Sequence, residues 1–524
     1  MRSVPSIFND VLGPVMRGPS SSHSAAANRI GRIARALAGE PLQKVTVSYD
    51  PNGSLVTTHK DQGSDLGLYG GILGWTPDDP RLPTYESALQ EAGIEVEVRY
   101  KNYSAPHPNF YRLVLLGKSG TTYQLDAIST GGGMIQLLSI EGIPFPTCGD
   151  LHHALFFLKD EPELAFSEAE YSSWHSHPDG YGFLNLSLRA PLSADKMASL
   201  GSTLGAKKSR QLPAILPVLA RAEMTVPFSR CREMLAHPEM QDLPLWKRAI
   251  LYEAQRGGLT EEQVLAHADS IRNILDAAIT TGLGGTSYQD RILPSQSPGF
   301  AVAEKEGRLI PAEINNAIIR SVTAIMEVKS SMGVIVAAPT AGSCGAMPGA
   351  VLAVAKALGK SDQETNQALV LAGLIGVFIT LDATFAAEEG GCMAECGSGA
   401  SMAAAAITYL AGGTNEQQIA AASMALQNSF GMICDPIANR VEAPCLGKNV
   451  MAASNALSCA NMALGGYDHL IPFDEVVISM NEVAQQIPRE LRCTNLGGLS
   501  TTPTSQRIAE TLNQGHPCGC KISC

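Results

Sequence analysis

Cysteine is the residue type whose placement in this sequence carries the most chemistry. Of the twelve cysteines in the 524-residue chain, ten lie after residue 340. Cys392, Cys434 and Cys445 lie in Gly- or Pro-containing segments between apolar helical segments. In a reducing compartment such clustering favours metal binding or catalysis over disulfides. A cysteine taken alone is more often a small buried apolar residue.

The intervals between these three cysteines are 42 and 11 residues, unlike the closely spaced pairs of a zinc ribbon. Three thiolates from separate loops can hold an iron–sulfur cluster. A cluster with three protein ligands leaves one iron open to act as a Lewis acid. Spacing alone therefore leaves two interpretations open, an iron–sulfur site and a set of buried thiols.

Two loops rich in hydroxyl groups precede apolar helical segments. Backbone N–H groups and hydroxyls at a helix N-terminus can bind a carboxylate or a phosphate. The alternative for the first loop is an ordinary serine cap, from Ser22 or Ser24, beside a solvated histidine. The second loop lacks the lysine of a phosphate-binding P-loop. The candidate binding residues are Ser20, Ser21, Ser22 and His23 in the first loop, and Thr340, Ala341, Gly342 and Ser343 in the second.

Residues 1–150 follow the pattern of an α/β domain. Apolar residues at helical spacing predict a helix over 25–37, and alternation predicts a strand over 45–49. Two alternating runs, 111–116 and 121–125, flank a Gly-Lys-Ser-Gly turn and predict a hairpin.

The segment 151–215 is expected to be a linker or an insertion. It holds His152, His153, His175 and His177. The last two could bind a metal, but histidines in a polar loop are more often solvated.

From residue 216 onward the pattern is helical, which predicts an all-α catalytic domain over 216–524 with a C-terminal tail. The fold class is therefore α+β multidomain, with an N-terminal α/β domain followed by an all-α catalytic domain. The predicted helices include 311–328, 350–358, 362–381, 401–410 and 416–426.

Composition and charge exclude some classes of function. The formal net charge is −12, which argues against nucleic acid as a partner because phosphate contacts need a basic surface. The longest apolar run, 368–381, is shorter than the roughly 18 residues that a membrane span needs. We see no signal peptide in the first 16 residues. A cytoplasmic protein with no membrane partner is expected.

Taken together, the motifs of this chain resemble those of the iron–sulfur-dependent L-serine dehydratases (L-serine ammonia-lyases). The motifs occur in that family's order and cover most of the chain outside about 150–215. They are Gly18-Pro19-Ser20-Ser21-Ser22-His23, Asn52-Gly53-Ser54-Leu55, Ser64-Asp65, Gly131-Gly132-Gly133, Pro339-Thr340-Ala341-Gly342, Gly391-Cys392, Cys434-Asp435-Pro436, Pro444-Cys445 and Leu496-Gly497-Gly498-Leu499.

The resemblance implies a β-type domain fused to an α-type catalytic domain, and deamination of L-serine to pyruvate and ammonia. It implies a [4Fe-4S] cluster held by Cys392, Cys434 and Cys445, and a homodimer. It also implies that the terminal Cys524 folds into the active site and occupies the open iron. The expected partner is a small amino-acid substrate. Lys329 and His23 are the candidates for the general base.

One departure from the family bears on the substrate. Gln62 stands in the stretch 61–65 where family members commonly have a histidine. A related lyase acting on L-cysteine or L-threonine is therefore an alternative, as is a non-enzymatic iron–sulfur sensor. A pyridoxal phosphate enzyme would also need a lysine motif, and we find no convincing one beside Gly131-Gly132-Gly133.

Overall fold

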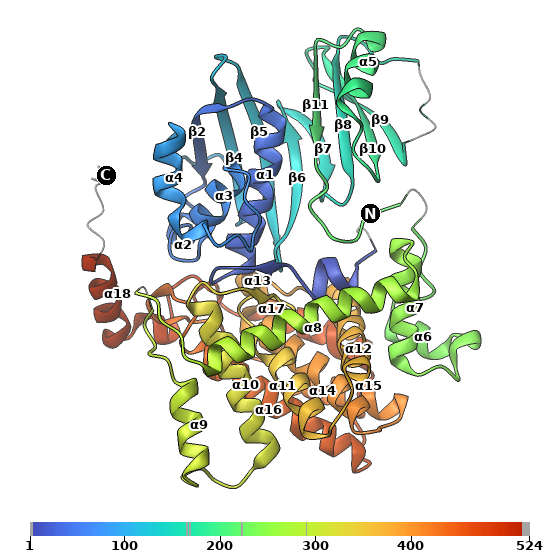
Figure 1. Cartoon of the computed structure of the whole chain (residues 1–524), viewed down its shortest axis with the longest axis vertical. Coiled ribbons are helices and arrows are strands. Elements are labelled where there is room, and N and C mark those ends of the chain that lie inside the picture. The colour runs from blue at the N-terminus through green and yellow to red at the C-terminus, as the bar shows by residue number, and fades with distance from the viewer. Residues whose placement is uncertain (1–3, 164–165, 167–168, 222–223, 290, 516–524) are drawn as a thin grey trace. The chain divides into compact units, whose positions relative to one another are not determined.

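The structure is a computed structural model that describes residues 4–515, except 164–165, 167–168, 222–223 and 290. Its chain divides into two compact units (Figure 1). Among the described residues, the α/β unit comprises 4–9, 21–227 and 252–260, and the helical unit comprises 10–20, 228–251 and 261–515. The predicted fold class, α/β followed by mostly helical, is confirmed.

A six-stranded sheet forms the centre of the α/β unit, in the order β3-β2-β4-β5-β6-β7. β2 pairs parallel with β3, and the remaining neighbours pair antiparallel. The predicted hairpin is confirmed, because β4 and β5 pair from Phe110 opposite Ile128 to Leu116 opposite Thr122. The strands are β2 (Leu42–Tyr49), β3 (Glu95–Tyr100), β4 (Phe110–Gly117), β5 (Thr122–Gly131), β6 (Met134–Ile140) and β7 (Ile143–Thr147).

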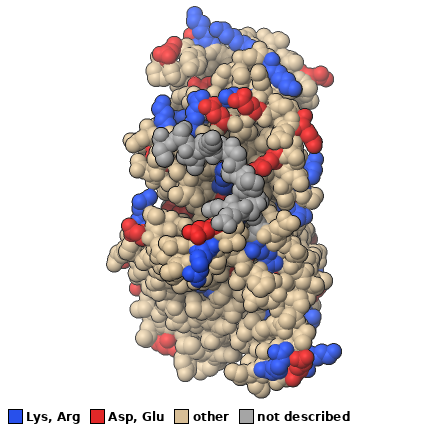
Figure 2. Space-filling view, turned by 90° about the vertical axis from the view of Figure 1, so that its left-hand side faces the viewer, with Lys and Arg blue, Asp and Glu red and all other residues tan. Residues whose placement is uncertain are grey.

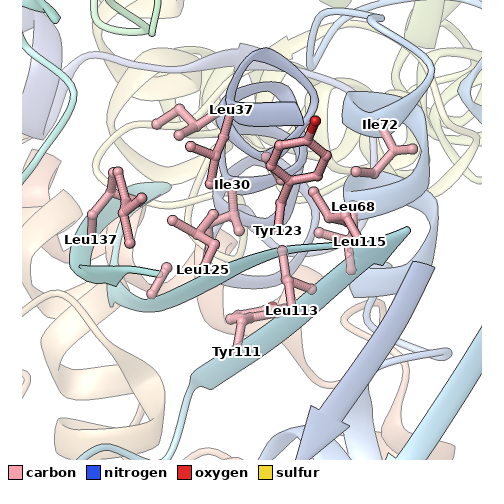
Figure 3. Packing of buried hydrophobic residues seen from close by; sticks show 14 of the residues in the cluster. Ile30, Leu37, Leu68, Ile72, Tyr111, Leu113, Leu115, Tyr123, Leu125 and Leu137 are labelled. Carbon is pink, nitrogen blue, oxygen red and sulfur yellow. The ribbon is translucent and has the colours of Figure 1, made fainter. Parts of the chain in front are cut away.

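Helices α1 and α3 pack on this sheet and bury a continuous apolar core (Figure 3). Ile30 and Leu37 of α1 lie against Leu113 and Leu125 of the sheet, all of them at most 1% exposed. The helical elements of this part are η2 (Ser21–Ala25), α1 (Ala26–Ala38), α2 (Leu55–Thr58), α3 (Ser64–Ile72), η3 (Leu82–Thr84) and α4 (Tyr85–Ala92).

The start of α1 differs from the prediction. No side chain caps this helix, and the residue before it, Ala25, is itself helical. Ser22 and Ser24 lie within the π-helical turn η2, which runs directly into α1. An N-cap residue needs an extended backbone. The expected cap from Ser22 or Ser24 is therefore wrong, because these serines are already inside a helical turn.

Two glycines bring the backbones of η2, α1 and α3 into contact. A Cβ atom on Gly67 of α3 would lie 1.9 Å from the backbone oxygen of Ser24. A Cβ atom on Gly31 of α1 would lie 2.2 Å from the backbone oxygen of Leu68. No side chain larger than hydrogen fits at such separations. The hydroxyl-rich segment of η2 is therefore fixed directly against α3.

The segment 151–215, expected as a linker or an insertion, holds a second sheet in the order β11-β8-β10-β9. All three strand pairs are antiparallel. Helix α5 covers an apolar face that includes Phe156, Leu184 and Leu186. The elements are β8 (His152–Leu158), β9 (Tyr171–Ser176), β10 (Gly182–Leu188), α5 (Ala194–Leu204) and β11 (Lys208–Leu212).

Helices make up most of the second unit, and the five predicted helices correspond to α10, α11, α12, α14 and α15. A two-stranded ladder joins β1 (Val15–Met16) to β12 (Ile335–Val336). The helices are α6 (Cys231–Ala236), α7 (Leu245–Gly257, whose residues from 252 onward belong to the α/β unit), α8 (Glu261–Leu283), α9 (Ser297–Lys305), α10 (Glu313–Ser330), α11 (Ala346–Ala357), α12 (Asp362–Asp382), α13 (Ala387–Cys392), α14 (Ser398–Leu410), α15 (Asn415–Gln427), α16 (Cys445–Leu464), α17 (Phe473–Gln486) and α18 (Pro503–Gly515). Short helical turns are η1 (Ile7–Val11), η4 (Pro238–Met240), η5 (Met393–Gly397), η6 (Ile437–Asn439), η7 (Arg489–Leu491) and η8 (Gly498–Thr501).

Helix α12 is the central apolar helix of this unit. Among the described residues it is the one helix long and apolar enough to cross a membrane, and 83% of its apolar window is buried inside the protein. Such burial is typical of a core helix.

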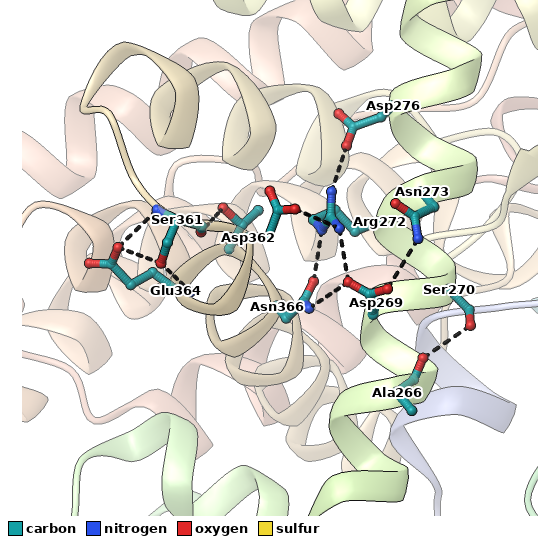
Figure 4. A network of polar contacts seen from close by, with 11 residues as sticks. Ala266, Asp269, Ser270, Arg272, Asn273, Asp276, Ser361, Asp362, Glu364 and Asn366 are labelled. Carbon is teal, nitrogen blue, oxygen red and sulfur yellow. Dashed lines mark hydrogen bonds and ion pairs between the residues drawn. The ribbon is translucent and has the colours of Figure 1, made fainter.

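Figure 4 shows how polar side chains fasten the first turns of α12 to α8. Arg272 of α8 donates to Asn366 of α12 at 3.1 Å and pairs with Asp362 at 3.1 Å.

Basic and acidic side chains are interspersed on the described part of the face in Figure 2.

Candidate metal and substrate site

Three side chains of the helical unit meet in one small group, in which the two thiols are buried and the carboxylate is half-buried. One ligand atom from each of Cys392, Glu395 and Cys434 lies within 4.8 Å of the other two. Cys392 ends α13, Glu395 lies in η5, and Cys434 lies in the segment before Pro436. Sulfur and carboxylate oxygen are both metal ligands, so this group could hold a metal.

A glycine turn directs Cys392 toward Cys434. Gly391 has a φ of 66°, in the left-handed region that favours glycine. A Cβ atom there would lie 2.9 Å from the backbone oxygen of Met432. Met393 N donates to that same oxygen at 2.8 Å. The Gly391-Cys392 motif therefore fixes the thiol against the segment that carries Cys434.

Cys445, the third predicted thiol, lies at the first residue of α16 and is 5% exposed. It is not part of the group within 4.8 Å. Burial is the main cause that raises its pKa, followed by the nearby acid Cys392. Hydrogen bonds with Cys392 and Cys493, together with burial, raise the pKa of Cys434 well above its usual value. Deprotonation of these thiols is unfavourable unless a positive charge lies close to the sulfur atoms. A bound metal ion supplies such a charge.

Lys448 is a cation beside this group. Its Nζ donates to Ile433 O at 2.6 Å and to Asp435 Oδ1 at 2.7 Å, and it lies 3.8 Å from Cys392 Sγ. Burial lowers the pKa of Lys448, but the acids Cys392 and Asp435 outweigh burial and raise its pKa overall. Lys448 lies one helical turn after Cys445 on α16, so one helix supplies a thiol and a charge.

The second hydroxyl-rich loop contacts the same group. Thr340 Oγ1 donates to Glu395 Oε1 at 2.7 Å, and the hydroxyl groups of Thr340 and Ser343 are 3.1 Å apart. Asn449 donates to Gly342 O at 2.8 Å and accepts from Ala346 N at 2.9 Å, which fixes the loop to α16. Burial raises the pKa of Glu395 and the Thr340 hydrogen bond opposes this rise.

Lys329 is fully buried near the end of α10. Its ammonium group donates to Val441 O, and its charge lowers the pKa values of Cys445 and Glu395. The structure thus places Lys329 within electrostatic reach of two residues of this region.

The first hydroxyl-rich loop is divided between the two units. Ser20 belongs to the helical unit, whereas Ser21, Ser22 and His23 lie in η2 of the α/β unit and are buried. His23 Nε2 lies 2.9 Å from Thr58 Oγ1. Burial and the neighbouring His59 lower the pKa of His23 to about 3, so its imidazole is neutral at neutral pH.

A second buried histidine lies close to the Gln62 position. His59 Nδ1 lies 2.8 Å from Asp65 Oδ1, and its Nε2 lies 2.8 Å from the Tyr100 hydroxyl. Asp65 belongs to the Ser64-Asp65 motif. Gln62 itself is 1% exposed, and its backbone oxygen accepts from Ser24 Oγ at 3.2 Å. A buried histidine, His59, therefore lies three residues before Gln62, which stands where family members commonly have a histidine.

Some predicted residues take other places. His175 lies in β9, where its ring nitrogens contact Ser173 Oγ and Pro144 O, and His177 follows that strand beside Asp179. Both histidines thus have protein partners. Cys524 lies outside the described residues, as do Cys518 and Cys520.

Three residues of this region, Glu395, Lys448 and Cys493, are not singled out by the sequence motifs. Cys493 forms a small apolar cluster with Ala387, Cys392 and Cys434. A signal for Glu395 existed, because it follows Cys392 by three residues and three residues is about one helical turn. Lys448 has the same spacing from Cys445. Cys493 had no such signal, because its neighbours are distant in sequence.

Comparisons with known proteins point to one family. Residues 240–500 match the family described as serine dehydratase alpha chain. The L-serine dehydratase alpha chain of Peptoniphilus asaccharolyticus is 39% identical over 286 residues, which cover 54% of this chain and 97% of that protein. The probable L-serine dehydratase beta chain of Bacillus subtilis is 36% identical over 156 residues, or 30% of this chain and 69% of that protein. L-serine dehydratase 2 of Escherichia coli is 24% identical over 501 residues, or 92% of this chain and 96% of that protein.

Proposed function

Because the chain belongs to the serine dehydratase alpha-chain family, we propose that it is an enzyme that deaminates L-serine to pyruvate and ammonia. It combines in one chain segments similar to separate alpha and beta chains, as expected of a fused L-serine dehydratase. The observation that carries the proposal is the group of the two buried thiols Cys392 and Cys434 with the half-buried Glu395, which lies inside the matched segment.

The proposed cofactor is a [4Fe-4S] cluster held by Cys392, Cys434 and Cys445. The donor set fits this group, since soft thiolates prefer iron–sulfur clusters and all three thiols are at most 5% exposed. Lys448 would balance part of the negative charge of the thiolates. When bound, the cluster supplies a Lewis acid that assists the departure of the substrate hydroxyl group.

The residues of the chain would bind and orient the amino acid. In the helical unit, Thr340 and Ser343 offer hydroxyl groups, and Gly342 is held in place by Asn449. In the α/β unit, Ser21 and Ser22 lie in a helical turn whose backbone N–H groups favour a carboxylate. Ser20 and Ala341 complete the two proposed binding loops.

Two groups remain candidates for removing the α-proton. His23 is uncharged at neutral pH, and its pKa of about 3 makes it a weaker base than an ordinary histidine. Lys329 is buried beside acidic groups and could accept a proton only in its uncharged form. After loss of water the enamine product tautomerises and hydrolyses without further residues.

The test is a turnover panel with anaerobically purified protein and L-serine, L-threonine and L-cysteine. Preferred turnover of L-serine, together with the broad absorbance of an iron–sulfur cluster, supports the proposal. Preferred turnover of L-cysteine or L-threonine would favour the related lyase, for which Gln62 is the motivating observation. Turnover of none of the three would leave the iron–sulfur sensor, and a pyridoxal-type spectrum would reject the cluster.

We also propose a homodimer, which sedimentation would reject if it showed a stable monomer.

A further inference from the structure

Cys493 is a fourth thiol beside the proposed metal ligands. Cys434 is 4% exposed and Cys493 is 5% exposed. Both pack with Cys392 and Ala387 in one small buried cluster, against Met432. Neither the family match nor the chemistry proposed above gives Cys493 a role.

The backbones of Cys434 and Cys493 are held as neighbours. Cys434 forms a parallel bridge with Arg492. Cys434 N donates to Leu491 O at 2.9 Å, and Cys493 N donates to Cys434 O at 3.0 Å. Bridged segments lie about 4.8 Å apart, and the Cα atoms of disulfide-bonded cysteines lie about 4.4–6.8 Å apart. The backbone separation is therefore compatible with a disulfide.

The backbone of Cys493 departs from that of a regular extended strand. In a regular extended segment the residue after Arg492 would point to the opposite face. Cys493 instead has a φ of 59°, which is uncommon for a residue other than glycine. Cys493 packs with Cys434 in the same small buried cluster. Such strained residues persist where the surrounding structure holds them, often at functional sites.

We propose that Cys434 and Cys493 form a reversible disulfide when the metal centre is lost, so that the ligand Cys434 is stored in a reducible form. The role of this disulfide in protecting a cluster ligand rests on the proposed function. The formation of the disulfide in the metal-free chain rests only on the placement of the two cysteines.

The chemistry balances with hydrogen peroxide as the oxidant. The sulfur of Cys434 attacks one peroxide oxygen as its thiol proton passes to the departing hydroxide, the O–O bond breaks, and one water leaves as the sulfenic acid forms. The sulfur of Cys493 then attacks this sulfenic sulfur, and the S–S bond forms as the second water leaves. Both thiol hydrogens end in water, and two electrons pass from the thiols to peroxide. Without a second thiol, Cys434 would continue to the irreversible sulfinic acid.

The experiment uses the full chain, purified anaerobically and stripped of metal with a chelator. After treatment with peroxide, remaining thiols are alkylated and the disulfide-linked peptides are identified by mass spectrometry. We expect a Cys434–Cys493 link as the main product, and much less of it in protein that keeps its iron. A main product that links Cys434 to Cys392, or no link to Cys434, would overturn the proposal.

Two variants and a control make the result specific. Cys493→Ser and Cys493→Asn should both abolish the link. Asparagine tolerates the left-handed backbone, so this variant removes the thiol with little added strain. Cys459→Ser is the control, because Cys459 is a buried cysteine of α16 that bonds to Asn428 and Asn455 instead. Loss of the link in the control as well would indicate general misfolding and count against the proposal.

A second readout separates this proposal from the proposed function. After peroxide, reduction with dithiothreitol and addition of iron and sulfide, the wild-type chain should bind several-fold more iron than Cys493→Ser. Equal recovery would overturn the protective role. A wild-type chain that never binds iron would defeat the proposed function, while the linked-peptide measurement would still decide the disulfide.

Discussion

Two regions of this protein bury acidic and basic groups in different combinations. In the α/β unit the buried His59 lies 2.8 Å from the carboxylate of the buried Asp65, and its other ring nitrogen lies 2.8 Å from the hydroxyl of the exposed Tyr100. In the helical unit Cys392, Glu395 and Cys434 bring three acids within 4.8 Å. A complementary pair satisfies itself, whereas a group of acids becomes stable when a cation joins it. The group of Cys392, Glu395 and Cys434 could therefore hold a metal cation.

The largest expected effect comes from removing one acid of the metal group. Cys392→Ser should lose iron and lower kcat/KM at least ~10³-fold, because Lewis-acid assistance contributes several kcal/mol. Iron analysis and turnover of L-serine measure the effect. Cys459→Ser is the matched control and should keep both. Full iron content in Cys392→Ser would contradict this prediction, because the thiol would then be only a packed side chain.

The next largest effect concerns the pH dependence of stability that the buried His23 gives the α/β unit. The pKa of His23 falls from 6.5 to about 3 on folding, so between these values the unfolded chain binds more protons. The free energy of unfolding should therefore decrease as pH falls through this window, by about 2–3 kcal/mol between pH 6.5 and 4.5.

The variant His23→Gln should flatten this dependence, whereas His177→Gln, at a partly exposed position, should keep it. Urea unfolding midpoints at several pH values give the slope. An unchanged slope in His23→Gln would show that another group carries the acid sensitivity.

A smaller effect is expected from the cation beside the acids. Lys448→Met removes the charge that lies 3.8 Å from Cys392 Sγ, and should weaken iron binding about 10–100-fold, as loss of a partner of a metal ligand does. Lys448→Arg keeps the charge and should fall between the two. Iron retention during titration with a chelator measures the difference. Equal retention in all three proteins would mean that the acids do not need Lys448.

The smallest expected effect is a change in the stability of the helical unit that does not involve Cys392, Glu395 or Cys434. Ser361 caps α12, and Glu364 completes the capping box. Ser361→Ala should lower the free energy of unfolding by about 1 kcal/mol. Iron content should stay constant in this variant. A loss of iron would show that the metal group depends on α12 more than its contacts suggest.

The helices of the second unit could be predicted from local pattern, because their apolar runs lack strand alternation. The predicted helix over 362–381 corresponds to α12, Asp362–Asp382. The start of α1 could not be predicted as well, since serine hydroxyls favour caps and also occur in π-helical turns. Propensity does not distinguish these cases.

The site could be predicted only in part. The motif around Gly391-Cys392 was recognisable by resemblance, but the contacts of Lys448 with Asp435 and of Cys434 with Cys493 join residues from different segments. His59 was hidden for the same reason, because its partner Tyr100 lies 41 residues away. Sequence pattern reports local periodicity, and these contacts are set by tertiary packing.

The backbone contact between Gly67 and Ser24 has a mechanical consequence. With 1.9 Å between a hypothetical Cβ atom and the Ser24 oxygen, α3 cannot slide along η2 without a collision. Asp65 lies two residues before Gly67 on the same helix and holds His59. The serine-rich turn η2 and the His59–Asp65 pair are therefore both attached directly to α3.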